Sequence, residues 1–227
     1  MEGALPILLF VGFFGLIIIA GIYGAKKAKE RREALMAMAQ RLGLRYRRER
    51  DRGLASELRL LNRLRLGSNR YCENVVSGDY EGAHIMAFDY HYETHSTDSK
   101  GNRQTHHHWQ GVMTLRLERF FPELTIAEEG FFSKIGQALG FPDIDFESHE
   151  FSRKFKVKSK DKKFAYDFCN ALMIEYLLEN TDLTIEVDED QLAIFFSRRL
   201  PAEAWEPNFQ RLRKLRELMP DYLFENV

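Results

Sequence analysis

The feature that most constrains this 227-residue chain is an uncharged stretch close to its first residue. No charged residue stands between Ala4 and Ala25, and thirteen Leu, Ile, Phe or Val residues lie between Leu5 and Ile22. At about −0.3 to −0.6 kcal/mol each, they contribute roughly −4 to −8 kcal/mol toward membrane insertion. The length matches the ~20 residues that cross a hydrocarbon core. We therefore predict a transmembrane anchor over residues 1–25, with residues 5–24 in the bilayer.

Two other interpretations of this stretch are a buried core helix and a cleaved signal peptide. Core helices seldom run this long without a polar residue. A signal peptide has a basic start and small residues before its cleavage site. Here the first three residues include no basic one, and Ile or Tyr stands three positions before each candidate cut. Both alternatives fit the residues less well than an anchor does.

The charges that flank the stretch predict its orientation. Nothing basic precedes it, and five basic residues follow it: Lys26, Lys27, Lys29, Arg31 and Arg32. The positive-inside rule places such a flank in the cytoplasm, and anionic headgroups attract it. We expect a single-pass protein of the inner (plasma) membrane, with its N-terminus outside and its C-terminal domain cytoplasmic. Residues 26–43 are expected to form a basic juxtamembrane helix that ends at Gly43.

The remaining residues, 44–227, have the composition of one globular domain. Charged residues make up 30% of the chain and aromatic residues 13%, and eighteen phenylalanines can build a core. The formal net charge of −1 argues against a nucleic-acid-binding protein, which would have a basic excess. Cys72 and Cys169 lack metal-site spacing and are expected to be reduced, partly buried thiols.

Hydrophobic periodicity predicts an α+β fold, with a mainly antiparallel sheet covered by helices. Three strand-like runs, 69–80, 83–95 and 105–117, form a meander, and Glu81-Gly82 joins the first two. Further expected strands are 44–49, 123–129 and 150–161, and residues 182–187 and 191–197 form a hairpin around 188–190. Expected helices are 54–66, 130–140, 161–180 and 201–219, the last interrupted near Pro207. Strands and helices are segregated rather than alternating, as in α+β domains.

Residues 146–179 resemble an uncharacterised family of bacterial membrane-anchored proteins that carry a C-terminal α+β domain. The matching positions are Glu147, Phe151, Phe155, Val157, Ser159, Asp161, Met173, Leu177 and Leu178. Residues 78–90, which begin Gly-x-Tyr-x-Gly, are similar to a hairpin of the same family. The resemblance implies a bacterial membrane location and a shared fold. It carries over no catalytic residue, because it consists of hydrophobic and turn positions.

Histidine forms the one unusual cluster, since five of the seven lie around Gly101: His91, His95, His106, His107 and His108. If a two-residue turn joins the two arms, at 100–101 or 101–102, then His95, His106 and His108 share a face with Glu93. Three imidazoles and a carboxylate can bind Zn²⁺ or Cu²⁺. A three-residue loop breaks this parity and removes the site. The competing interpretation is a polar hairpin tip with solvated histidines.

No catalytic motif stands out, so an enzyme is not predicted and no cofactor is expected outside the metal hypothesis. The sequence lacks a phosphate-binding glycine loop, a nucleophile elbow and a His-Glu-x-x-His motif. We therefore expect a non-enzymatic binding module of unknown ligand, held at the cytoplasmic face of a bacterial membrane. Its partner would be a protein or an envelope component, not a nucleic acid. A metal-binding protein that uses the His-rich hairpin, and a hydrolase with an unrecognised site, remain alternatives.

Overall fold

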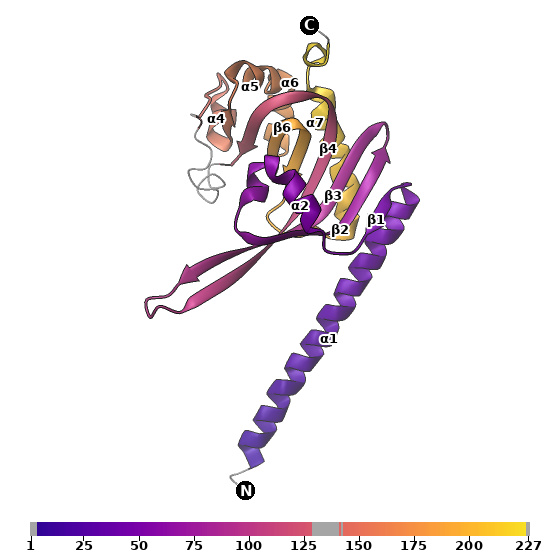
Figure 1. Cartoon of the computed structure of the whole chain (residues 1–227), viewed down its shortest axis with the longest axis vertical. Coiled ribbons are helices and arrows are strands. Elements are labelled where there is room, and N and C mark those ends of the chain that lie inside the picture. The colour runs from indigo at the N-terminus through magenta and orange to yellow at the C-terminus, as the bar shows by residue number, and fades with distance from the viewer. Residues whose placement is uncertain (1–3, 129–140, 142, 226–227) are drawn as a thin grey trace.

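The computed structural model describes residues 4–128, 141 and 143–225 (Figure 1). A long helix, α1 (Ala4–Arg41), leads into a domain built around one sheet. The strands are β1 (Arg45–Arg47), β2 (Ser68–Tyr80), β3 (Ala83–Thr97), β4 (Arg103–Ala127), β5 (Lys156–Ser159) and β6 (Thr184–Phe195). The other α-helices are α2 (Arg52–Glu57), α4 (His149–Lys154), α5 (Lys162–Phe168), α6 (Ala171–Glu179) and α7 (Trp205–Leu218). Short 3₁₀ turns follow α2 at Leu58–Leu60 and Asn62–Arg65.

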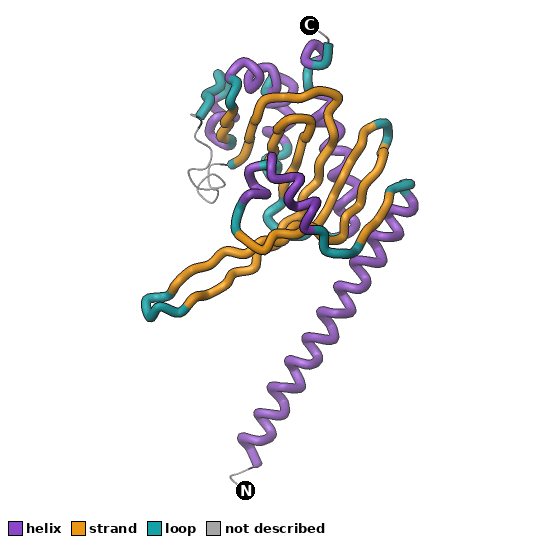
Figure 2. Tube along the Cα trace, in the orientation of Figure 1, coloured by secondary structure: helices purple, strands orange, loops and turns teal. Residues whose placement is uncertain are grey.

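The six described strands form one antiparallel sheet with the order β1-β2-β3-β4-β5, in which β6 also pairs with β4 (Figure 2). The predicted α+β class, the predominantly antiparallel sheet and the β2–β3–β4 meander are thus confirmed. Glu81 and Gly82 both have positive φ, 46° and 84°, as the tight hairpin turn between β2 and β3 requires. The β3–β4 hairpin and the N-terminal half of α1 extend from the same end of the domain (Figure 1).

Helices cover both faces of the sheet. On one face, the end of α1 and α7 pack on Ile85, Ala87 and Met113 in the main core, which also contains Phe155. On the other face, α2 and the 3₁₀ turns bury Leu61 and their other leucines against alternate residues of β2, β3 and β6. Alternation along β3 therefore separates the two cores, as the period-2 geometry of a strand dictates.

The helix α1 runs without a break through the uncharged stretch and the basic residues that follow it. It ends where Gly43 adopts φ 70°, a conformation that glycine reaches without strain. Leu35, Met38 and Ala39 in its last turns are buried in the main core, so this end of the helix belongs to the domain. Among the described residues, no helix has a segment that meets the length and hydropathy criteria for crossing a membrane.

Several predicted elements differ from those observed. Residues 161–180 form two helices rather than one, because the Asn170 side chain accepts a hydrogen bond from the Met173 amide and begins a new helix. In place of the hairpin expected over 182–197, residues 184–195 form the single strand β6, in which Glu189, at φ 52°, lies at an irregularity opposite Phe121. Likewise, β4 contains the whole strand expected at 105–117 and residues 123–127 of the strand expected at 123–129.

The remaining differences concern the ends and the extent of helices. Residues 149–154 are helical, because Ser148 caps α4 through the Phe151 amide, and only residues 156–159 of the expected strand remain extended. Pro207 does not interrupt α7, since it lies in the first turn, where its missing N–H costs no helical hydrogen bond. The segment 54–66 is helical only in part, and Leu54, Leu58, Leu61 and Leu64 are buried. The helix expected at 130–140 lies outside the described residues.

Candidate functional site

A row of polar and aromatic side chains continues the main core face of the sheet toward the β3–β4 hairpin. Along β3 the side chains on this face change from Ile85 and Ala87 to Asp89, His91 and Glu93. Their cross-strand neighbours on β4 are Gly111, Trp109 and His107. We call this surface the polar strip, and it consists of Tyr71, Glu73, Asp89, His91, Glu93, His107 and Trp109.

Two β-bulges in β2 shape the polar strip. Asn69 and Arg70 together oppose one residue of β3, and Asn74 and Val75 do the same five residues later. Asn69 and Asn74 have φ values of 47° and 53°, in the left-handed region that asparagine tolerates better than most residues. Each asparagine side chain then donates to an acidic group of the strip, Asn69 to Glu93 at 2.6 Å and Asn74 to Asp89 at 2.9 Å.

Asp89 binds α1 to the sheet. Its carboxylate is fully buried and accepts two hydrogen bonds from the Arg31 guanidinium, at 2.7 and 2.9 Å. Arg31 also donates to the Leu200 carbonyl oxygen, at 2.8 Å from Nε and 2.6 Å from Nη2. Arg31 was counted among the basic residues that follow the uncharged stretch. In the structure its side chain points into the domain and forms a bidentate ion pair with the buried Asp89 carboxylate.

Arg199 joins the centre of the polar strip from the segment that follows β6. The segment passes close over Gly111, whose amide bonds to the Arg198 carbonyl oxygen at 3.0 Å, and a Cβ on Gly111 would lie 3.4 Å from Leu200 Cγ. The Arg199 guanidinium lies 3.2 Å from the centroid of Trp109 and donates to Glu73 at 2.8 Å. Burial raises the pKa of Glu73 above its ordinary value, and the Arg199 charge opposes that rise.

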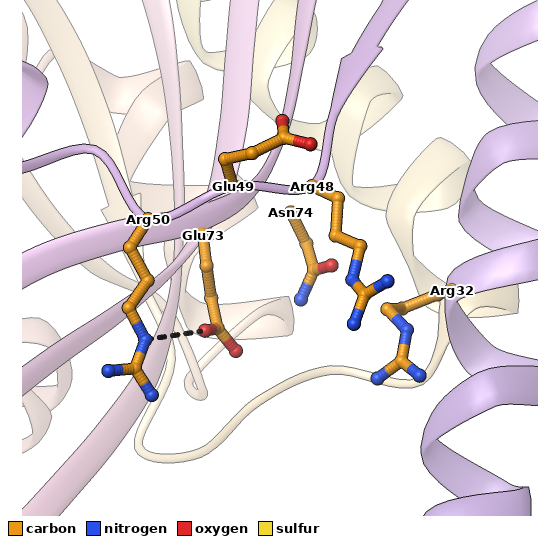
Figure 3. Close-up of a pocket in the computed structure, with 6 residues that line it drawn as sticks. All are labelled: Arg32, Arg48, Glu49, Arg50, Glu73 and Asn74. Carbon is orange, nitrogen blue, oxygen red and sulfur yellow. Dashed lines mark ion pairs between the residues drawn. The ribbon is translucent and has the colours of Figure 1, made fainter.

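A basic pocket opens between α1 and the edge of this network (Figure 3). It has a volume of about 520 Å³ and is lined by Arg32, Arg48, Glu49, Arg50, Glu73 and Asn74. Arg50 lies 3.9 Å from Glu73. The head groups of Arg32 and Arg48 point into the same space, whereas the Glu49 carboxylate points away (Figure 3). Within the described part of the chain no carboxylate forms an ion pair with Arg32 or Arg48, so this end of the pocket is positively charged.

The structure does not bring the predicted metal ligands together. Five residues, 98–102, connect Thr97 to its partner Arg103, and Asp98 organises this loop by accepting from the Lys100 and Asn102 amides. The prediction assumed a loop with an even number of residues. A loop with an odd number places each β4 side chain on the opposite face of the sheet from the one predicted. His106 and His108 consequently lie on the opposite face from His95 and Glu93, where they bond to Ser96 and Thr94.

A different set of ligand types meets on the polar strip instead. His91, Glu93 and His107 have candidate ligand atoms that all lie within 4.8 Å of one another. His91 Nε2 is 3.1 Å from His107 Nδ1, which is 3.4 Å from Glu93 Oε1. His91 is buried and packs against both Tyr71 and Trp109, with ring centroids 4.5 and 4.6 Å away. These three ligand types lie together on one face, whereas the predicted set of His95, His106, His108 and Glu93 is divided between the two faces of the hairpin.

Two other groups of buried reactive side chains have a structural explanation. Glu123 and Glu186 fix the segment after α2, since Glu123 accepts from Asn62 at 2.6 Å and from Lys160, and Glu186 accepts from the Arg63 amide at 3.2 Å. Burial raises the pKa of Glu186 to about 7. Cys72 and Cys169 are buried free thiols, and burial raises the pKa of both well above the ordinary value, so neither is a ready nucleophile.

Sequence reasoning missed the centre of the polar strip, although signals for it were present. Asp89 interrupts the apolar phase of a strand that otherwise reads as core-facing, and a buried carboxylate at such a position needs a cationic partner. Asn69 and Asn74 are residues that strands disfavour, which is a mark of bulges. Arg31 and Arg199 carry no local signal, because only the folded chain brings them to Asp89.

Comparison with known proteins finds a similar fold among solved structures. No protein-family model matches the chain, and no curated protein matches it. The fold is similar to that of the mycobacterial trehalose monomycolate transport factor A, TtfA, with a TM-score of 0.57. The alignment covers 83% of this chain and 96% of TtfA at 11% sequence identity. At this identity the likeness concerns the fold alone.

Proposed function

We propose that this chain is a membrane-anchored, non-enzymatic binding module that recognises an anionic headgroup in the basic pocket at the base of α1. The anchor is residues 5–24, and the domain is on the cytoplasmic side of a bacterial inner membrane. The support for the anchor is the uncharged stretch 4–25, followed by five basic residues up to Arg32. In this proposal the lipid bilayer is a binding partner of the chain through residues 5–24.

The observation that carries the proposal is the pair Arg32 and Arg48 beside the Asn74 amide (Figure 3), since neither arginine forms an ion pair with a carboxylate among the residues that the structure describes. Guanidinium groups bind phosphate through two parallel hydrogen bonds, and an amide N–H₂ adds a further donor. Arg32 follows Ala25 by seven residues of continuous helix, which is about 10 Å at 1.5 Å per residue. A pocket at that height above the end of the anchor is within reach of headgroup phosphates.

The arrangement of the domain agrees with this proposal. The Arg31–Asp89 pair fixes the direction of α1 relative to the sheet, so the anchor and the pocket move as one unit. The β3–β4 hairpin, which has a polar tip, extends toward the same side as the N-terminal half of α1 (Figure 1). TtfA, whose fold is similar, is described as a trehalose monomycolate transport factor.

The test measures which lipid stays bound to the purified chain. The full-length protein is extracted in mild detergent, and the phospholipid retained by each chain is identified by native mass spectrometry. We expect anionic phospholipid to be retained, and the double variant Arg32→Gln/Arg48→Gln to lose it. Arg45→Gln is the matched control, because Arg45 is an exposed arginine of β1 that does not line the pocket. Equal retention by all three proteins would contradict the proposal.

A further inference from the structure

His91, Glu93 and His107 make up a cluster on the polar strip whose geometry is not explained by anion binding. His91 and Glu93 are two residues apart on β3, so they lie on one face, and His107 is the cross-strand partner of Glu93. The three candidate ligand atoms lie within 4.8 Å of one another. The set combines two imidazoles with one carboxylate, which is a ligand combination found in zinc sites.

From this cluster we infer a binding site for a divalent transition-metal ion, with Zn²⁺ as the best match, in which His91 Nε2, His107 Nδ1 and a Glu93 carboxylate oxygen are the protein ligands. Zinc bonds to nitrogen and oxygen of about 2.0–2.2 Å separate neighbouring ligand atoms of a tetrahedron by about 3.3–3.6 Å. The pairs His91–His107 and His107–Glu93 are already at 3.1 and 3.4 Å. Only small side-chain movements are needed to admit the ion.

Asn69 supplies the surrounding hydrogen bonds that such a site needs. The Nδ1 atom of His91 lies 3.2 Å from the Asn69 carbonyl oxygen, to which it donates its proton, and this leaves Nε2 with its lone pair toward the cluster. The Asn69 side chain donates to Glu93 Oε1 at 2.6 Å and orients the carboxylate. Because Asn69 is the first residue of a bulge at φ 47°, one backbone distortion positions both ligands.

The hydrogen bonds of the metal-free cluster determine which ring nitrogens can coordinate an ion. In the metal-free protein the His107 Nδ1–H donates to His91 Nε2. On binding, the ion replaces this proton, which leaves Nδ1, and His107 takes the tautomer with its hydrogen on Nε2.

The fourth coordination position would face solvent. The His107 side chain is 60% exposed, so water can reach the ion from that side. Three protein ligands with an open fourth position are typical of zinc sites that bind a further small ligand. The site lies at the base of the hairpin and does not share a residue with the basic pocket, so the inference does not depend on the proposed lipid recognition.

The test is metal titration of the full chain in detergent after removal of metal with a chelator. We expect about one equivalent of Zn²⁺ per chain by calorimetry, and Co²⁺ should give the visible absorption of tetrahedral coordination. Glu93→Gln and His107→Ala should each weaken binding by about tenfold or more. Both positions are at least partly exposed, and circular dichroism will verify that the variants remain folded.

The matched control is His106→Ala, which removes a neighbouring exposed imidazole from the opposite face of the hairpin. Zn²⁺ affinity should be unchanged in this variant. Equal weakening by His106→Ala and His107→Ala would overturn the inference, because it would indicate unspecific chelation by the histidine-rich hairpin. Binding that persists in Glu93→Gln and His107→Ala, or no stoichiometric binding to the wild type, would overturn it as well.

Discussion

Asp89→Asn should test how strongly the buried ion pair holds α1 to the domain. The change keeps the size of the side chain and removes the negative charge that faces Arg31 and Arg199. Breaking a buried pair by removing one partner typically costs roughly 3–5 kcal/mol. The Arg31 side chain is 20% exposed and keeps its bonds to the Leu200 carbonyl oxygen, so part of its charge remains solvated. We therefore expect a loss near the lower end, about 3 kcal/mol.

Urea unfolding of the full chain in detergent, followed by tryptophan fluorescence, measures this loss. Trp109 and Trp205 are suitable reporters, because the guanidinium carbons of Arg199 and Arg31 lie 3.2 and 5.9 Å from their ring centroids. The unfolding midpoint should fall without a change in slope. Asp79→Asn is the control, since this carboxylate is 84% exposed and bonds only to His84 in the described structure. A loss below about 1 kcal/mol for Asp89→Asn would refute the reasoning.

Three further predictions address the core, a buried carboxyl and the topology. Phe155→Ala should destabilise the domain by roughly 3–5 kcal/mol in urea unfolding, because Phe155 is buried in the main core, whereas Lys156→Ala should have little effect. Burial raises the pKa of Glu186 from its ordinary 4.5 to about 7, so the folded chain holds a proton that the unfolded chain has lost between these values. The free energy of unfolding should therefore fall by up to roughly 3 kcal/mol as pH rises from about 5 to about 7. Glu186→Gln should flatten this dependence, and an unchanged slope would contradict the role of Glu186. A reporter active only in the cytoplasm, fused after Val227, should be active, and activity of a periplasmic reporter instead would reverse the orientation.

Those parts of the fold that depend on local chemistry were predictable from the sequence. The meander follows from period-2 alternation, and the Glu81-Gly82 turn from residues that tolerate positive φ. The continuity of β4 and β6 was not predictable, because it depends on their pairing with each other. That pairing keeps β4 extended through Pro122 and β6 extended through the acidic residues 188–190. Asn170 is a residue type that commonly caps the N-terminus of a helix, but the strong apolar pattern on both sides of it favoured a single helix.

For the candidate sites, the sequence indicated which types of residue are present but not which of them lie together in the folded chain. The histidine cluster was evident, but its grouping depends on whether the hairpin loop has an odd or even number of residues. Asp98 accepts two amide hydrogen bonds and stabilises a five-residue loop, and this single local structure exchanges the faces of His106 and His107. The basic pocket joins Arg32 of α1 to Arg48 and Asn74, and their proximity follows from the long-range pairing of β1 with β2.

The most direct test of the central claim identifies what occupies the basic pocket in native membranes. A photo-crosslinking amino acid at position 50, which lines the pocket, is activated in intact cells, and the adduct is identified by mass spectrometry of the purified chain. The same probe at position 45 is the control. We predict an adduct with an anionic phospholipid at position 50 that disappears in the Arg32→Gln/Arg48→Gln background. A protein adduct without lipid at position 50, or lipid adducts of equal yield at both positions, would contradict recognition of an anionic headgroup by this pocket.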